Sequence, residues 1–277
     1  MDCRKWSDKY STDCDLKYQS ETTRENYKSC VRQFLYCFKD YREPKEIPTD
    51  EIKKWLLKAN TVNTRKHRLC SVKSFYEITV GMPNKIDRIP YPKSDKKLPI
   101  VLSISEVQRM FDVCENKKHK VILALLYSCG LRVSELINLK WDHIDRSRMI
   151  INIIQAKGKK DRQVMLPEQL IPLLEQYYHE YKSVEYVLNG WKDEPQYTAE
   201  SVRNVIKQLA EKAGINKRVY THLMRHCSFT HMVEAGVDIN LIQKLAGHNN
   251  VKTTNMYLHI SHNHISKIQS PISAIKL

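Results

Sequence analysis

A proline-rich segment, residues 81–100, is the feature that most constrains the fold of this chain. Its prolines stand among lysines and aspartates, a composition that disfavours regular structure and suits a semi-extended linker. They are Pro83, Pro90, Pro92 and Pro99. The chain has 277 residues, enough for two domains with separate cores at about 150 residues per domain. We therefore predict a linker over residues 82–100 that joins a domain at 20–81 to a domain at 101–277.

The predicted domain at residues 20–81 has the spacing of three amphipathic helices, with apolar residues three and four positions apart. The helices are expected over residues 22–40, from Pro48 to Asn60, and over residues 61–80. Thr22-Thr23-Arg24-Glu25 has the form of a capping box for the first helix, and Gly81 closes the third. Residues 1–19 show mixed charge without a period, which predicts a poorly ordered N-terminal arm or a peripheral segment.

The charge of the chain favours a polyanionic partner such as nucleic acid. Lysine and arginine number 46 against 31 aspartates and glutamates, which gives a formal net charge of +15 and a pI near 9.4. Residues 51–100 alone contain twelve basic and four acidic residues. The residues predicted to contact phosphates are Lys53, Lys54, Arg65, Lys66, Arg68 and Lys73. Binding through such contacts is expected to weaken steeply as salt rises.

The sequence disfavours the membrane, secreted and metal-binding classes of protein. Its longest apolar run, Val121–Tyr127, is far shorter than the roughly 18 residues that span a bilayer. Residues 1–15 are charged and lack the apolar stretch of a secretory signal, so we expect a cytoplasmic location. No two of the eight cysteines form a C-x-x-C pair, and His259, His262 and His264 lack cysteine or carboxylate partners at ligand spacing. We expect free thiols, no metal and no cofactor.

Residues 101–277 combine a short β-hairpin with many helices. Ser103-Ile104-Ser105-Glu106 is a capping box that starts one helix, and a strongly apolar helix begins at Lys120. Met149–Ile154 and Arg162–Leu166 have the pattern of two strands joined by a basic hairpin tip. Further helices are expected over residues 167–180, 198–213, 222–235, 238–246 and 251–260. The predicted fold class is therefore mainly α with a small β-sheet, the second domain being α+β.

Six polar residues of this second domain have ordinary structural explanations when each is taken alone. They are Arg132, Lys157, His222, Arg225, His248 and Tyr257. Arg132 could pair with Glu135, and Tyr257 could be a packing residue. Their order along the chain changes this interpretation. An arginine follows an apolar helix, and then come a hairpin lysine, His-x-x-Arg, Leu-Ala-Gly-His and a tyrosine.

In this order of motifs the chain resembles the tyrosine recombinase family, the phage integrases, including the Xer-type recombinases. The matching strings are GLRVSEL at 130–136, AKGKKDR at 156–162, HLMRH at 222–226, LAGH at 245–248, and Tyr257. The resemblance covers residues 100–260 and, more weakly, residues 22–80. The chain departs from the family pattern at Met224 and over Cys227–His231, which are expected to pack the helix behind the site.

The resemblance implies a helical core-binding (SAM-like) domain followed by the α+β catalytic domain. It also implies DNA strand exchange without metal or ATP, through a 3′-phosphotyrosyl intermediate, a released 5′ hydroxyl and a Holliday junction. The implied partners are double-stranded recombination sites and three further copies of the chain, in a homotetramer on two sites. Residues 261–277 are expected to pack on a neighbouring protomer or on their own domain. The expected location is the cytoplasm, on the nucleoid when DNA is bound.

The residue types suit a phosphodiester exchange that uses no metal. Two guanidiniums, those of Arg132 and Arg225, can donate paired hydrogen bonds to the equatorial oxygens of a phosphorane. Glu135 is expected to orient Arg132. His222 is a candidate proton acceptor or phosphate donor, and His248 is a candidate donor to a non-bridging oxygen.

The sequence also contains candidates for the nucleophile and for the general acid of this reaction. A phenol can hold the cleaved strand as a covalent ester that preserves the energy of the broken bond, and Tyr257 is the candidate. Lys157 on the hairpin is the candidate general acid for the departing 5′ oxygen. Two other functions stay open: a catalytically idle DNA-binding or architectural protein on the same scaffold, and a type IB topoisomerase that relaxes DNA. The presence of all six residues together disfavours the idle protein.

Overall fold

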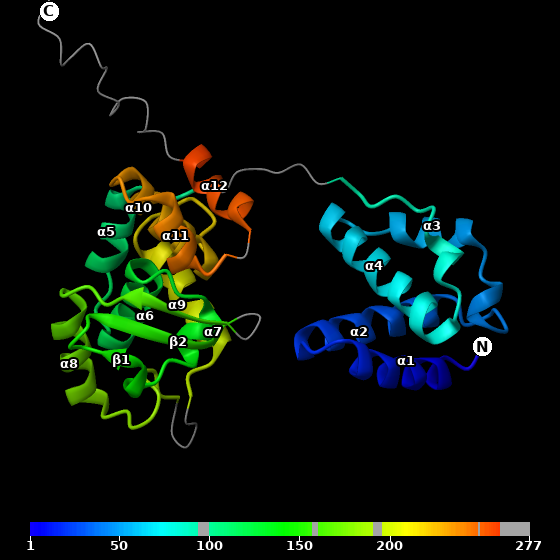
Figure 1. The fold of residues 1–277 in the computed structure, drawn as a ribbon, viewed down its shortest axis with the longest axis horizontal. Coiled ribbons are helices and arrows are strands. Elements are labelled where there is room, and N and C mark those ends of the chain that lie inside the picture. The colour runs from blue at the N-terminus through cyan, green and yellow to red at the C-terminus, as the bar shows by residue number, and fades with distance from the viewer. Residues whose placement is uncertain (94–99, 157–159, 191–195, 249, 261–277) are drawn as a thin grey trace, which may run out of the picture. The chain divides into compact units, whose positions relative to one another are not determined.

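The computed structural model describes residues 1–93, 100–156, 160–190, 196–248 and 250–260. The chain divides into two compact units, Met1–Lys96 and Lys97–Leu277 (Figure 1). We call them the N-terminal unit and the C-terminal unit. The division falls inside the segment for which the sequence predicts a linker.

The described part of the N-terminal unit is built from helices. They are α1 Cys3–Lys17, α2 Glu21–Cys37, η1 Pro44–Glu46, α3 Thr49–Leu57, α4 Val62–Phe75, the π-helical turn η2 Tyr76–Val80, and η3 Pro83–Ile86. α1 packs on α2, and α2 packs on α4. Val31, Phe34 and Leu35 of α2 lie in the core of the unit, as their spacing of three and four positions predicts.

Residues 1–19 are not the poorly ordered arm that their mixed charge predicts. Most of them form α1, in which Tyr10 and Cys14 have no exposed surface and belong to the core of the N-terminal unit. The prediction was wrong because the inner face of α1 is marked only by Trp6, Tyr10 and Cys14. These residues stand four positions apart among charged neighbours, so the local pattern is weak, and packing against α2 provides the stability.

Two boundaries of the N-terminal unit also differ from the sequence prediction. The residue that caps α2 is Ser20 rather than Thr22. At the other end Gly81 closes the third helical segment, as predicted, with a φ of 75° that glycine adopts without strain. The turn Pro83–Ile86 follows, and Ile86 is buried in the core. The unit therefore extends past residue 81, into the segment predicted as linker.

The described part of the C-terminal unit combines helices with one three-stranded antiparallel sheet, so the predicted fold class is confirmed (Figure 1). The strands lie in the order β1-β2-β3. The first elements are α5 Ile104–Asp112, α6 Lys117–Ser128, α7 Val133–Ile137, η4 Trp141–His143, β1 Ile144–Asp145, β2 Ile150–Ala156 and β3 Lys160–Met165. The remaining helices are α8 Leu170–Tyr181, α9 Ala199–Lys212, α10 Thr221–Glu234, α11 Ile239–Ala246 and α12 Val251–Ile260. The predicted capping box of Ser103 and Glu106 is present at α5.

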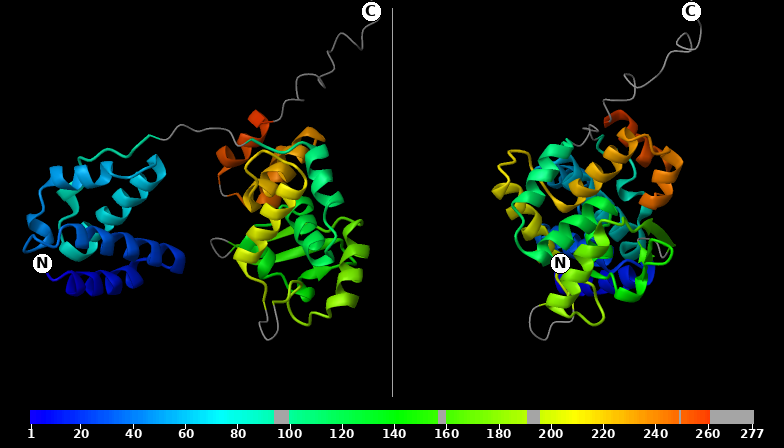
Figure 2. Two further views of the ribbon diagram at one scale, coloured as in Figure 1. Left: turned by 180° about the vertical axis from the view of Figure 1, so that it is seen from behind. Right: turned by 90° about the vertical axis from the view of Figure 1, so that its left-hand side faces the viewer.

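The described part of the C-terminal unit has two hydrophobic clusters. The larger surrounds α6, whose residues Val121–Leu126 are all buried, and α6 contacts α8, α9 and α10. The smaller contains Phe229 and Val233 of α10, Ile242 of α11 and Tyr257 of α12. It holds these three helices together at one end of the unit, as both views in Figure 2 show. The candidate residues on α10 and α12 are thereby brought side by side.

The structure also bears on membrane, thiol and metal chemistry. Among the described residues no helix is long and apolar enough to cross a membrane. All eight cysteines are free thiols. The described residues contain no group of three or more histidines, cysteines or carboxylates arranged to hold a metal ion.

The packing of α1 can be tested at Tyr10. Tyr10→Ala should lower the free energy of unfolding of the N-terminal unit by about 3 kcal/mol, because it leaves a cavity in the core. Tyr10→Phe keeps the ring and should lower the free energy of unfolding by less than about 1.5 kcal/mol. Urea unfolding of the full-length chain, followed by tryptophan fluorescence, measures both, since Trp6 and Trp55 lie in this unit. Equal stability of wild type and Tyr10→Ala would show that α1 does not pack.

Candidate active site

Arg225 lies at the centre of the candidate site and has no exposed surface. Its guanidinium donates hydrogen bonds to the backbone oxygens of Gly130 and Ala246. It also lies over the ring of Phe229, 4.7 Å from the ring centroid. Burial, and to a smaller degree the charges of Arg132 and Arg162, lower the pKa of Arg225 to about 9. Arg225 therefore remains a cation at pH 7.

Arg132, at the start of α7, contacts the same backbone oxygen of Ala246 as Arg225 does. Its Nη2 donates to the Ala246 oxygen over 3.2 Å, and its Nη1 donates to Glu135 over 2.7 Å. The side chain is 22% exposed, so part of the guanidinium stays accessible. Because Ala246 accepts from both Arg132 and Arg225, the two guanidiniums converge instead of facing apart.

The Ala246 oxygen is free for this role because α11 ends there, and the last carbonyls of a helix have no partner within it. Gly247 follows with a φ of 58°. A Cβ at this position would lie 2.8 Å from Cδ of Arg162. Glycine is therefore required both by the left-handed turn and by the close approach of Arg162. This explains the glycine of the LAGH string.

Glu135 is buried between two arginines. It accepts from Arg132 through the backbone amide and the side chain, each over 2.7 Å, and from Nη1 and Nη2 of Arg162, the latter over 2.7 Å. Burial alone would raise the pKa of Glu135, but Arg162 and Arg132 outweigh it and hold the pKa at about 2. Glu135 is therefore ionised, and it contacts Arg132, the residue that the sequence analysis expects it to orient.

Arg162 is a site residue that sequence reasoning missed. It lies on β3 with 6% of its side chain exposed, and its Nε donates to the Leu245 oxygen over 2.8 Å. It therefore joins the hairpin, Glu135 and the end of α11. The alternating strand pattern did not show that its side chain points into the site, although it is the last residue of the AKGKKDR string. The three arginines outnumber the single carboxylate, which leaves a positively charged pocket suited to a phosphate.

Three histidines lie beside this cationic pocket. The rings of His222 and His226 on α10 are 4.5 Å apart between centroids. Nδ1 of His248 forms a 3.0 Å hydrogen bond with Oγ1 of Thr254. Burial is the largest cause of a lowered pKa in all three imidazoles, and nearby positive groups add to it. The pKa values of His226 and His248 are lowered to about 4, so these imidazoles are neutral at pH 7.

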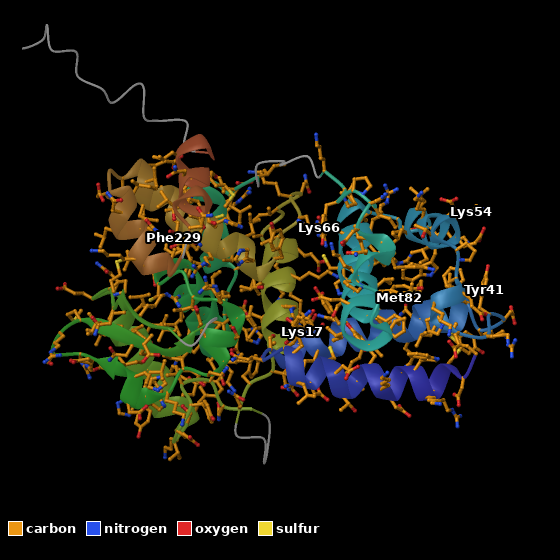
Figure 3. The ribbon with its side chains drawn as sticks, turned by 45° about the vertical axis from the view of Figure 1, so that its right-hand side comes forward. Lys17, Tyr41, Lys54, Lys66, Met82 and Phe229 are labelled. Carbon is orange, nitrogen blue, oxygen red and sulfur yellow. The ribbon has the colours of Figure 1, made fainter. Side chains whose placement is uncertain are left out.

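Tyr257 of α12 completes the site. It is 1% exposed, and its ring contacts Phe229, labelled in Figure 3, at 5.5 Å between centroids. His248 lies nearly parallel to the ring at 6.2 Å, and His226 lies at 5.8 Å. Burial raises the pKa of Tyr257 to about 12, against the opposing effect of Arg225 and Arg132. The phenol is therefore protonated and enclosed.

The structure thus brings together five of the six candidate catalytic residues with Glu135. The sixth, Lys157, lies outside the described residues, between β2 and β3. The side chain of His259 and all of His262 and His264 also lie outside them, as does the tail at 261–277.

The phosphate-contact candidates lie on α3 and α4, and most of them have partners within the N-terminal unit. Lys53, Lys54 and Lys73 form ion pairs with nearby carboxylates. Arg68 lies over the ring of Trp55, 4.7 Å from the centroid. Lys66 is exposed on α4, and Lys54 is exposed on α3 (Figure 3). Because these ion pairs are solvated, the lysines can exchange a carboxylate for a phosphate at little cost.

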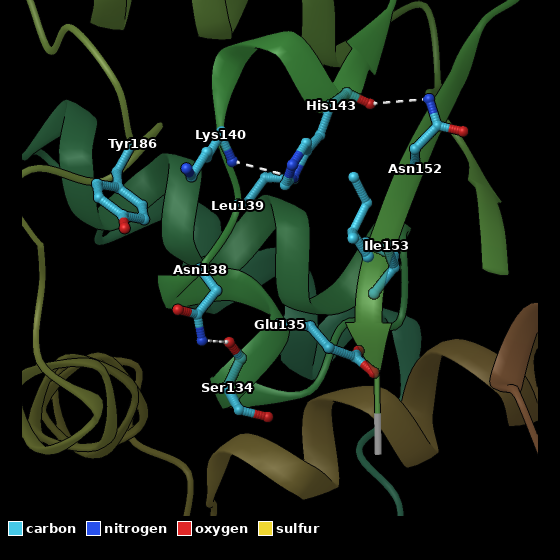
Figure 4. Close-up of a pocket in the computed structure, with 10 residues that line it drawn as sticks. Ser134, Glu135, Asn138, Leu139, Lys140, His143, Asn152, Ile153 and Tyr186 are labelled. Atoms are coloured by element: carbon cyan, nitrogen blue, oxygen red, sulfur yellow. Dashed lines mark hydrogen bonds between the residues drawn. The ribbon is translucent and has the colours of Figure 1, made fainter. Parts of the chain in front are cut away.

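A polar hollow of about 350 Å³ borders the candidate site at Glu135 (Figure 4). Several of its polar side chains form hydrogen bonds with backbone atoms of the residues that line it. Asn138 donates to the Ser134 oxygen over 2.6 Å, and Asn152 donates to the His143 oxygen over 3.4 Å. We assign no ligand to this hollow.

The role of Arg162 can be tested by removing its charge. Arg162→Met should lower the free energy of unfolding by about 3 kcal/mol at pH 7, because it breaks a buried ion pair. The folded pKa of Glu135 is depressed from 4.5 to about 2, so its contribution is present above pH 4.5 and lost as pH falls toward 2. The difference in free energy of unfolding between wild type and Arg162→Met should therefore become smaller below pH 4.5. Urea unfolding between pH 7 and pH 3 measures it.

A matched control is Arg203→Met, which breaks an exposed pair with Glu200 of 3.0 Å. This variant should lower the free energy of unfolding by less than about 1 kcal/mol at any pH. If the Arg162 and Arg203 variants behave alike, Arg162 does not hold a buried carboxylate.

Comparison with known proteins agrees with this arrangement. Residues 101–264 match the sequence pattern described as Phage integrase family, and residues 6–86 match that of the Phage integrase, N-terminal SAM-like domain. Tyrosine recombinase XerA of Thermococcus kodakarensis is 31% identical over 278 residues, which cover 97% of this chain and 95% of that protein.

Two solved structures have a similar fold. A crystal structure of XerA recombinase is 26% identical with a TM-score of 0.56, and the match covers 96% of this chain and 97% of that one. A lambda integrase tetramer bound to a Holliday junction is 16% identical with a TM-score of 0.78, covering 96% and 80% of the two chains, and at this identity it shows the fold alone. Since the integrase pattern covers more than half of the residues, the chain belongs to the phage integrase family of tyrosine recombinases, enzymes that transfer DNA strands in site-specific recombination.

Proposed function

We propose that this chain cuts and rejoins DNA at recombination sites through a 3′-phosphotyrosyl intermediate on Tyr257. The observation that carries the proposal is the convergence of Arg132 and Arg225 on the Ala246 oxygen, beside the enclosed phenol of Tyr257. Two guanidiniums held at one point can bind both non-bridging oxygens of a phosphodiester. They stabilise the extra negative charge that develops when the phosphorus becomes five-coordinate.

The first step joins the strand to the protein. The phenolic oxygen of Tyr257 attacks phosphorus, and the bond to the 5′ oxygen breaks. His222 accepts the phenolic proton as the bond to phosphorus forms, or donates a hydrogen bond to the phosphate while solvent takes that proton. His248 donates a hydrogen bond to the phosphate, and Lys157 gives a proton to the 5′ oxygen. The phosphotyrosyl ester keeps the energy of the broken bond, so rejoining needs neither ATP nor a cofactor.

The burial of Tyr257 adds a requirement to this step. With 1% exposure the phenol cannot meet a DNA phosphate in the position described. α12 must shift before attack, and the contacts that resist this are those of Tyr257 with Phe229, His226 and His248. Cleavage is thereby limited to the complex with DNA, whose binding energy offsets the cost of moving α12.

Strand exchange requires four active sites on two duplexes, and we extend the proposal to a homotetramer that acts through a Holliday junction. The lambda integrase of similar fold is a tetramer bound to such a junction. In our proposal the N-terminal unit grips one face of the duplex through its basic residues. The tail at 261–277 packs on a neighbouring protomer.

The nucleophile can be tested with nicked suicide DNA. Wild-type protein should form a denaturant-resistant adduct, and Tyr257→Phe should form none while binding DNA normally, because only the hydroxyl is lost. Gel electrophoresis under denaturing conditions measures the adduct, and Tyr178→Phe on the exposed side of α8 is the control.

The adduct assay, together with assays of supercoil relaxation and of two-site joining, separates two alternative functions. If the wild type forms no adduct, the chain is a DNA-binding protein on a recombinase scaffold. If it forms an adduct and relaxes supercoiled DNA but never joins two sites, it acts as a type IB topoisomerase.

The phosphate contacts can be tested at Lys66. Lys66→Gln should weaken DNA binding uniformly across sequences and reduce the slope of log K against log salt by about 1, since one phosphate contact is lost. Binding titrations between 50 and 200 mM salt, the range in which about six to ten contacts change affinity strongly, measure the slope. An unchanged slope would place Lys66 away from the DNA.

A further inference from the structure

Arg162 is a nearly buried cation to which the proposed reaction steps give no task. Its side chain is 6% exposed, and that of its partner Glu135 is 4% exposed. Nη1 and Nη2 of Arg162 donate to Glu135, one to each carboxylate oxygen. This bidentate geometry is the strongest way in which an arginine holds a carboxylate. A buried ion pair is often no more stabilising than an apolar pair of the same volume, so stability alone does not account for it.

Arg132 is the guanidinium of the pocket that a phosphate can reach from solvent. Its side chain is 22% exposed, whereas Arg225 has no exposed surface. Among the described residues, Arg132 donates from Nη1 to Glu135 and from Nη2 to the Ala246 oxygen. A guanidinium has five N–H donors, so three remain for an incoming anion. In the described part of the chain, Glu135 is the one carboxylate paired with Arg132, and it therefore competes with that anion.

The way in which the two arginines share Glu135 limits this competition. Oε1 of Glu135 accepts from Nη1 of both arginines, and Oε2 accepts from Nη2 of Arg162 and from the backbone amide of Arg132. The guanidinium of Arg132 therefore forms one hydrogen bond with the carboxylate instead of two. Arg162 is held from its other side, because its Nε donates to the Leu245 oxygen over 2.8 Å and its side chain passes close to Gly247. These contacts fix the guanidinium of Arg162 against Glu135.

We infer that Arg162 is a positioning residue that keeps Glu135 from neutralising Arg132, and so leaves Arg132 free to bind the DNA phosphate. This inference rests on the proposed function. With Arg162 in place, the described residues of the pocket carry three arginine charges against one carboxylate. Without Arg162, Glu135 would turn both oxygens to the guanidinium of Arg132 and cancel the accessible charge. The five-coordinate phosphorus would then meet one uncompensated arginine, that of Arg225, instead of two.

The ionisation of Glu135 agrees with this division of charge. Burial would raise the pKa of Glu135, and Arg162 has a larger effect than Arg132 in lowering it to about 2. The negative charge of Glu135 is therefore compensated mainly by Arg162. Arg132 keeps the greater part of its own charge for a ligand.

The test compares Arg162→Met with the double variant Arg162→Met/Glu135→Gln in single-turnover cleavage of nicked suicide DNA. We expect Arg162→Met to cleave about 100-fold more slowly than wild type, as when one donor to the developing charge is lost. Glutamine carries no charge that could neutralise Arg132, so the double variant should return to within about tenfold of wild type. Arg162→Lys keeps the charge but not the bidentate geometry, so its rate should lie between those of wild type and Arg162→Met. Arg203→Met, which breaks an exposed ion pair, is the matched control.

Binding of inorganic phosphate gives a second measurement that does not depend on cleavage. The NMR chemical shifts of the His222 and His248 imidazoles report phosphate in the pocket. We expect Arg162→Met to weaken phosphate binding about tenfold and the double variant to restore it, whereas a purely structural role of Arg162 would not be restored by a second substitution.

Two results would overturn the inference. One is an Arg162→Met variant that cleaves DNA and binds phosphate within about threefold of wild type. The other is a double variant that does neither better than Arg162→Met, because Arg162 would then only brace the fold. Wild-type protein that forms no adduct on Tyr257 contradicts the proposed function instead, and the phosphate titration still tests the inference in that case.

Discussion

One backbone oxygen, that of Ala246, is the point on which the site depends. It accepts hydrogen bonds from Arg132 and Arg225, whose like charges would otherwise drive them apart. Its position at the last residue of α11 helps, because the C-terminal end of a helix carries partial negative charge. The carboxylate of Glu135, held between Arg132 and Arg162, supplies the remaining compensation. Four stretches distant in sequence are thereby joined into one positively charged pocket.

Burial leaves the arginines of the site charged and the histidines and tyrosine neutral. The arginines stay charged, while the same low-polarity surroundings keep His226, His248 and Tyr257 neutral at pH 7. Cationic groups are thus available to bind phosphate, and neutral groups are available to move protons. Under the proposed function, the enclosed phenol of Tyr257 must be uncovered before it can attack DNA.

Much of this arrangement could be predicted from sequence, because helices with dense apolar spacing and the motifs at Arg132, Arg225 and Tyr257 are local signals. α1 was missed because its inward residues are too sparse to stand out from their charged neighbours. Arg162 was missed because the alternation of a strand shows which face a residue occupies but not which carboxylate it reaches. The pairing of Arg225 with two backbone carbonyls could not be predicted, since a carbonyl has no signature in sequence.

The central claim is that the phenolic oxygen of Tyr257 becomes esterified to DNA. Mass spectrometry of the covalent complex, after nuclease and trypsin digestion, tests it most directly. The account predicts a nucleotide attached through its 3′ phosphate to Tyr257, in the peptide that begins at Thr253. A nucleotide found on any other side chain, or linked through its 5′ phosphate, would contradict it.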